Sequence, residues 1–138
     1  MNFSGRCSCG SVSYEAKVDP ILQGNCHCEH CQRSTGSAYS ATAFFPTGSV
    51  EITGETKQFT GAGESGTTTV TFCPNCGTHL FTTPKTMPGL MGVRAGTLND
   101  PNNYKPSADI FTRSAVAWDH MDPSLPKFET YPPMGNDA

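Results

Sequence analysis

The chain has 138 residues, which is the length of one ordinary domain with a modest core and leaves little room for a second. Its hydrophobic fraction is 36%, and its 14 glycines and 11 prolines indicate many turns between short strands. The net charge of −3, the scattered Lys and Arg, and the lack of a long apolar run or an apolar N-terminal leader argue against a nucleic-acid or membrane partner.

The first predicted element is a half-buried strand over residues 11–18, because apolar and polar residues alternate strictly there. Val12, Tyr14, Ala16 and Val18 would lie on its buried side. Asp-Pro at residues 19–20 ends this strand.

Further short strands follow along the chain. The small polar run at residues 33–37 predicts a loop or a single helical turn, and the glycine-rich run at residues 61–66 predicts a turn. Alternating or β-branched apolar runs predict strands over residues 39–45, 50–52, 67–72, 80–83, 90–95 and 109–112. From about residue 122 to residue 138 the prolines predict an extended tail. We therefore expect one all-β domain over residues 1–138, with no long helix.

Seven cysteines are the strongest chemical signal, and they occur as Cys7-x-Cys9, Cys26-x-Cys28-x-x-Cys31 and Cys73-x-x-Cys76. We expect a soluble, cytoplasmic protein, and the cytoplasm keeps thiols reduced. An odd number of cysteines would also leave one thiol unpaired if all were used in disulfides. The pattern therefore indicates metal binding.

The cysteines divide most simply into four and three, because a structural zinc site usually closes with four ligands. One short loop supplies Cys26, Cys28 and Cys31, which we call the trio. The four others would form a structural site that joins the N-terminal segment to a tight turn far along the chain: Cys7, Cys9, Cys73 and Cys76.

The trio leaves a fourth position for water or substrate, as a catalytic zinc requires. Alternatively, His27, His30 or another side chain completes this site, and both metals are structural. His27 lies between two of the cysteines, so in an extended segment its side chain points away from their metal.

Three thiolates make zinc a weaker Lewis acid than three imidazoles would. A soft thiol substrate suits such a site better than water, because coordination deprotonates the thiol and presents it as a nucleophile or leaving group.

The residues around the cysteines resemble the glutathione-dependent formaldehyde-activating enzyme family, which includes the centromere protein V domain. The similar segments cover nearly all of the chain and are residues 5–12, 26–33, 35–37, 72–78, 95–101, 109–111 and 117–118. All seven cysteines follow the order and spacing of the family. One departure is Asp109, where members often carry a histidine.

The resemblance implies a β-tent fold and the four-plus-three zinc arrangement. It also implies an enzyme that combines glutathione and formaldehyde into S-(hydroxymethyl)glutathione, a carbon–sulfur lyase reaction. The expected partner is glutathione or a related small thiol, a homodimer is compatible with the sequence, and the expected cofactor is two zinc ions per chain. The alternative is a non-catalytic, zinc-stabilised binding module.

Several other residues have candidate roles. Arg33 could anchor a carboxylate of the substrate through its planar guanidinium. Ser34 and Thr35 more often satisfy backbone groups or thiolates than bind substrate. We expect His79 to lie in the core or beside the ligands, and Trp118 to pack in the core.

No general base can be named from a motif. Glu29 and Asp119 are the candidates.

Overall fold

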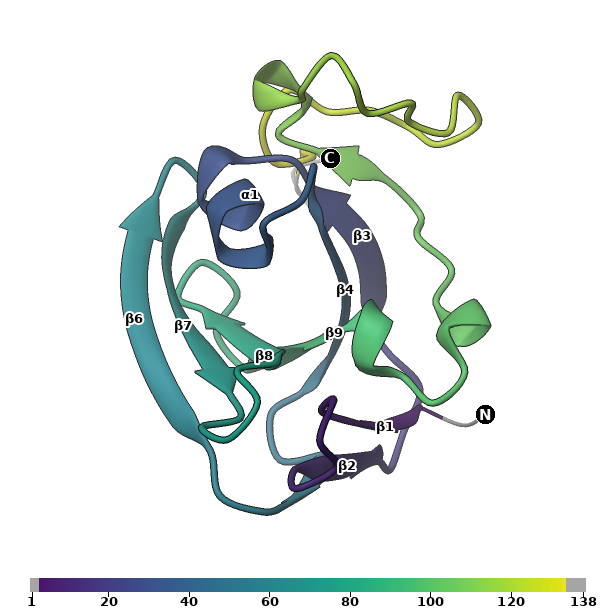
Figure 1. The fold of residues 1–138 in the computed structure, drawn as a ribbon. Coiled ribbons are helices and arrows are strands. Elements are labelled where there is room, and N and C mark those ends of the chain that lie inside the picture. The colour runs from purple at the N-terminus through teal and green to yellow at the C-terminus, as the bar shows by residue number, and fades with distance from the viewer. Residues whose placement is uncertain (1–2, 134–138) are drawn as a thin grey trace.

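The structure is a computed structural model that describes residues 3–133, and it is mainly β with one short helix (Figure 1). The strands are β1 (Ser4–Arg6), β2 (Ser13–Ala16), β3 (Leu22–Cys26), β4 (Ser40–Pro46), β5 (Val50–Thr53), β6 (Lys57–Gly63), β7 (Gly66–Phe72), β8 (His79–Pro84), β9 (Leu90–Arg94) and β10 (Asp109–Ile110). The helix α1 spans Glu29–Thr35, and the 3₁₀ turns are η1 (Ala95–Thr97), η2 (Pro101–Asn103) and η3 (Thr112–Ser114). The expected fold class is thus confirmed.

The strands form two sheets. The smaller sheet has the order β1-β2-β5, and the larger has the order β10-β3-β4-β9-β8-β7-β6. Every pairing is antiparallel except that of β10 with β3, which is parallel. The parallel pairing places Ile110 beside Cys26, so the C-terminal part of the chain reaches the cysteine trio.

The hydrophobic core lies between the smaller sheet and one face of the larger sheet. Tyr14 of β2 meets Phe81 of β8 edge to face at 5.2 Å between ring centroids, and Phe3 meets Phe45 of β4 in the same way at 5.5 Å. Because side chains alternate along a strand, the neighbours of these core residues point to the opposite face. Thr42 of β4 and Arg94 of β9 are register partners on that opposite face.

Helix α1 packs against β4 and β6, across the curved larger sheet (Figure 1). The Cys28 sulfur caps the helix by accepting a hydrogen bond from the Cys31 N–H. Gly36 ends it in the left-handed conformation at φ 67°, and its N–H donates to the Gln32 carbonyl. The run at residues 33–37 is therefore the end of a two-turn helix.

Four predictions about local structure were wrong. Val18 is 47% exposed because β2 ends at Ala16, and Trp118 is 67% exposed, outside the core. The predicted turn at residues 61–66 is only Glu64 and Ser65, because β6 continues to Gly63 and β7 begins at Gly66. The strand from residue 109 stops after Ile110, because Phe111 adopts the left-handed conformation at φ 56°.

The tail runs along the segment that contains β10. The Asp109 N–H donates to the Pro126 carbonyl, and the Phe128 N–H donates to the Asp109 carbonyl. Residues 134–138 of the predicted tail lie outside the described residues.

Within residues 3–133, no helix has the length and apolar character that crossing a membrane would require.

Candidate metal centres and their surroundings

The first cluster brings together four cysteines from two distant segments. The two N-terminal cysteines follow β1, and the other two lie on the tight turn after β7. Their sulfur atoms all lie within 4.8 Å of one another: Cys7, Cys9, Cys73 and Cys76. The predicted grouping is therefore present in the structure.

Hydroxyl and N–H groups surround this first cluster and favour thiolates at Cys9 and Cys76. Ser11 Oγ lies 3.0 Å from the Cys9 sulfur and 3.2 Å from the Cys73 sulfur. Hydrogen bonds from Ser11 and then Asn75 lower the pKa of Cys9 to about 7, and those from Thr78 lower the pKa of Cys76 to about 5. Four thiolates match the closed tetrahedral set of a structural zinc.

The second cluster is the trio. Cys26 ends β3, Cys28 caps α1, and Cys31 lies in its first turn, so that their sulfurs also lie within 4.8 Å of one another. Cys28 is fully buried, whereas Cys26 and Cys31 are partly exposed. Solvent therefore reaches two of the three residues of this cluster in part.

Within the trio, the hydrogen bonds favour a thiolate on Cys28. Its sulfur lies 3.2 Å from Ser65 Oγ and accepts a bond from the Cys31 N–H at 3.3 Å. Hydrogen bonds from Cys26 and then Cys31 hold the pKa of Cys28 well below its usual value, and the same bond to Cys28 raises the pKa of Cys26. A soft divalent metal that needs deprotonated sulfur fits this donor set.

No histidine belongs to either cysteine group within residues 3–133. His27 points away from the trio, as expected, and His30 packs against β6, where it meets Gly61 and Gly63. The described residues thus supply three ligands at the trio, one fewer than a closed zinc site takes.

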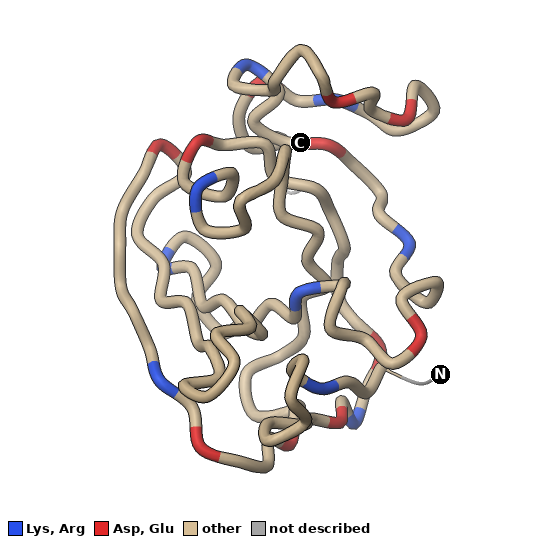
Figure 2. The backbone as a smooth tube through the Cα atoms, viewed as in Figure 1, with Lys and Arg blue, Asp and Glu red and all other residues tan. Residues whose placement is uncertain are grey.

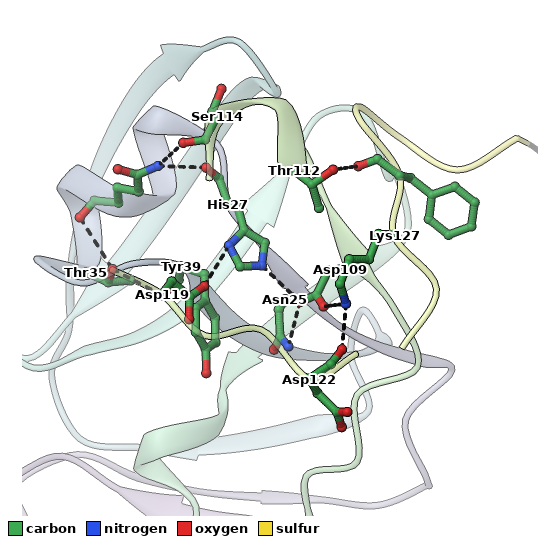
Figure 3. A network of polar contacts seen from close by, with 12 residues as sticks. Asn25, His27, Thr35, Tyr39, Asp109, Thr112, Ser114, Asp119, Asp122 and Lys127 are labelled. Atoms are coloured by element: carbon green, nitrogen blue, oxygen red, sulfur yellow. Dashed lines mark hydrogen bonds and ion pairs between the residues drawn. The ribbon is translucent and has the colours of Figure 1, made fainter. Parts of the chain in front are cut away.

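His27 instead belongs to a buried polar network that joins the cysteine loop to the C-terminal segment (Figure 3). Its Nε2 lies 2.9 Å from Asp109 Oδ1, and its Nδ1 lies 3.3 Å from Asp119 Oδ2. The amide of Gln32 reinforces this connection by donating to the carbonyls of both His27 and Ser114. Asp119 is therefore a partner of His27, and the network fixes the backbone between Cys26 and Cys28.

Asp109 lies at the centre of this network. Besides His27, it accepts hydrogen bonds from Asn25 Nδ2 at 3.1 Å and from Lys127 Nζ at 3.0 Å. Burial alone raises the pKa of Asp109, but these bonds, led by that of His27, outweigh burial and hold it below the usual value. Asp109 thus places a buried carboxylate beside His27.

The candidate substrate anchor, Arg33, lies on the outer side of α1. Its side chain is 79% exposed and forms an ion pair with Glu29 at 3.5 Å. Ser34 and Thr35 both donate to the Cys31 carbonyl, so they satisfy the backbone as expected. Burial and then the charge of Arg94 lower the pKa of His79, which is partly buried and packs against the ring of Phe72.

Ser11, Ser65 and Arg94 also surround the two clusters, and none of them was predicted from the sequence. The two serines give no signal in the sequence, since their hydroxyls reach the sulfurs only after folding. Arg94 did give a signal, because it is the only charged residue in the apolar run at residues 90–95.

Comparison with known proteins places this site in a family. The chain is 28% identical over 78 residues to a protein of Penicillium rubens named "Putative glutathione-dependent formaldehyde-activating enzyme". The match covers 55% of this chain and only 41% of that relative.

A crystal structure of a Rhodobacter sphaeroides protein has a similar fold. It superposes with a TM-score of 0.57 at 19% identity, over 72% of this chain and 93% of the other. The profile described as "Glutathione-dependent formaldehyde-activating enzyme" (GFA) matches residues 2–114, which is most of the chain. This chain therefore belongs to the glutathione-dependent formaldehyde-activating enzyme family.

Proposed function

We propose that this protein is a zinc-dependent carbon–sulfur lyase that joins glutathione, or a related small thiol, to formaldehyde at the trio. The observation that carries the proposal is the cluster itself: three sulfurs converge, two of the three residues are partly exposed, and the described residues add no fourth ligand. Membership of the family supports the choice of thiol and aldehyde.

Two zinc ions per chain fit the two clusters. Cys7, Cys9, Cys73 and Cys76 would hold a structural ion, and Cys26, Cys28 and Cys31 would hold a catalytic one. When bound at the trio, zinc supplies a Lewis acid that stabilises the substrate thiol as a thiolate.

The proposed reaction is balanced without an oxidant or reductant. The substrate sulfur forms a bond to the aldehyde carbon, the carbon–oxygen double bond becomes a single bond, and the thiol proton ends on that oxygen. The chain holds the trio in place through the α1 cap at Cys28 and the His27 network. Arg33 is exposed on α1, two residues after Cys31, where it would bind a carboxylate of glutathione.

We place the protein in the cytoplasm, because free thiols persist in that compartment. The single-domain organisation and a homodimer stay predictions.

The direct test of the function measures thiol adduct formation. Protein reloaded with zinc is mixed with glutathione and ¹³C-formaldehyde, and NMR exchange spectroscopy measures the rate of adduct formation above the uncatalysed rate. We expect catalysis by the native chain and its loss in Cys31→Ser, which removes one of the three trio ligands. A native chain that loads two zinc ions and leaves the uncatalysed rate unchanged would favour the binding module instead.

The role of Arg33 is tested separately with two thiols. Arg33→Gln should raise KM for glutathione by about tenfold or more, since a charged hydrogen bond contributes about 1.5–3 kcal/mol. The same variant should leave KM unchanged for 2-mercaptoethanol, which has no carboxylate. An equal change for both thiols would rule out carboxylate recognition.

A further inference from the structure

Arg94 is a buried cation on the face of the larger sheet opposite the core. Only 8% of its surface is exposed. Its Nη1 donates to Thr42 Oγ1 at 3.1 Å, and its Nη2 donates to Ser34 Oγ at 3.5 Å. Both acceptors are neutral hydroxyls, so neither offsets the positive charge.

No carboxylate compensates this charge in the part of the chain that the structure describes. None of the ion pairs within residues 3–133 includes Arg94, and its buried Nε has no hydrogen-bond partner. A buried charge without a partner is costly, and buried charges in proteins are paired or bind ions. The compensating negative charge must therefore come from another group.

The trio is the negative group beside Arg94. Arg94 is the register partner of Thr42 in β4, and the same strand pairs Ser40 with Cys26, so the guanidinium lies close enough to the trio for the charges of all three cysteines to act on it. Ser34 accepts a hydrogen bond from Arg94 and also donates to the Cys31 carbonyl, so one side chain links Arg94 to the backbone of the trio. A divalent cation bound by three thiolates leaves one net negative charge, which one guanidinium neutralises.

We propose that Arg94 is the counter-ion of the trio, a positioning residue that holds three thiolates together and raises their affinity for a divalent metal. This inference rests on the proposed function, because it assumes that the trio binds metal. The alternative role, binding of a substrate carboxylate, is disfavoured by the deep burial of the guanidinium between Thr42 and Ser34.

The test measures metal affinity in the full chain under reducing conditions. Zinc is removed, and Co²⁺ and then Zn²⁺ are titrated in competition with a chromophoric chelator, with the thiolate-to-cobalt absorption reporting each site. Arg94→Gln should lower the affinity of the trio for metal by about 10–100-fold, which is the usual effect of removing a group that supports metal ligands. Binding at the four-cysteine cluster should change less than about twofold, which also reports that the variant is folded.

Two matched variants isolate the charge. Arg113→Gln removes a positive charge from an exposed arginine and should change the metal affinity of the trio less than about twofold, because exposed charges are screened. Arg94→Lys loses the planar fork but keeps the charge. Because the counter-ion role depends on the charge, the metal affinity of this variant should stay within about threefold of the native affinity. If Arg94→Gln fails to fold, Arg94→Lys decides the question alone: retained affinity supports the counter-ion role, and a loss of tenfold or more overturns it.

The other outcomes separate this inference from the proposed function. Native trio affinity in a folded Arg94→Gln variant overturns the counter-ion role, and a raised KM for glutathione in that variant would assign Arg94 to the substrate. A native chain that loads both sites without forming adduct overturns the lyase and leaves the counter-ion role intact. A native chain that never loads a second metal ion overturns both.

Discussion

Asp109 connects the C-terminal segment to the loop that carries the cysteine trio, through its contact with His27. Its carboxylate is almost fully buried and accepts hydrogen bonds from Asn25, His27 and Lys127. Such a group is stable only while all of its partners remain, because an unpaired buried charge costs several kcal/mol. The C-terminal segment that carries Lys127 therefore contributes to the position of the cysteine loop.

The depressed pKa of Asp109 predicts a pH-dependent contribution to stability. An unfolded aspartate titrates at about 3.9, so the native carboxylate stabilises the fold above that pH and loses this effect as the pH falls through its lower folded-state pKa. Asp109→Asn should lower the free energy of unfolding by about 3 kcal/mol at pH 7, and the difference from the native chain should become smaller below about pH 4. Urea unfolding of the native chain and of Asp109→Asn, from about pH 7 to below about pH 4, measures both effects. Any loss of metal at low pH affects the two proteins alike, so it does not change the difference between them.

A surface ion pair provides the control for this prediction. Glu51 pairs with Lys17 at 3.5 Å, and both side chains are more than half exposed. Glu51→Gln should therefore change the free energy of unfolding by less than about 1 kcal/mol. Parallel profiles for native protein and Asp109→Asn would show that the hydrogen bonds do not depress the Asp109 pKa.

At the scale of elements, the packing of α1 on β6 depends on glycine. A Cβ added at Gly63 would lie 2.5 Å from His30 Cβ, which is closer than packed carbon atoms allow. Because His30 is one residue before Cys31, this contact also sets the distance between the helix and the sheet at the trio.

Gly63→Ala should therefore push α1 away from β6 and lower the free energy of unfolding by about 1–3 kcal/mol. Gly96→Ala is the matched control, since its Cβ would enter open space and its φ is not in the left-handed region. That control should be neutral or stabilising by up to about 1 kcal/mol. Thermal unfolding of the two variants measures the difference, and equal melting temperatures would contradict the close packing of His30.

The elements that could be predicted from the sequence are those with local signals. Strict alternation located β2 and β4, cysteine spacing located the trio and the two cysteine pairs, and the four ligands of a structural zinc site joined those pairs into one cluster. Helix α1 was predicted only as a possible single turn, since its cap is a cysteine sulfur rather than a common capping residue. The position of Arg94 depends on the pairing of β9 with β4, which no local pattern reveals.

The exposure of Trp118 also depends on tertiary structure that no local pattern in the sequence reveals. A large aromatic residue usually packs in a core, but the core here is formed by other residues and does not include Trp118. The left-handed Phe111 ends β10, and its buried ring packs edge to face on Tyr131 at 4.9 Å between centroids. Both features depend on tertiary contacts of the C-terminal segment.

At the scale of the whole molecule, the two clusters differ in how much chain they connect. Cys9 and Cys73 are 64 positions apart, and their cluster joins the segment after β1 to the end of β7. The trio lies within one loop that β3, α1 and the His27 network already hold. Figure 2 also shows Lys and Arg on separate elements across the molecule, so long-range charge attraction adds little to these connections.

This difference predicts that the two clusters fail in different ways. Cys76→Ser removes one of four ligands from the connection between distant segments, and structural zinc contributes folding free energy of order 10 kcal/mol. Against a net stability of about 5–15 kcal/mol, this variant should be insoluble or loosely folded. Cys28→Ser should stay folded, retain about one zinc ion and lose thiol-dependent activity. Circular dichroism and zinc analysis measure both, and a Cys28→Ser variant that unfolds as completely as Cys76→Ser would make the trio a second structural site.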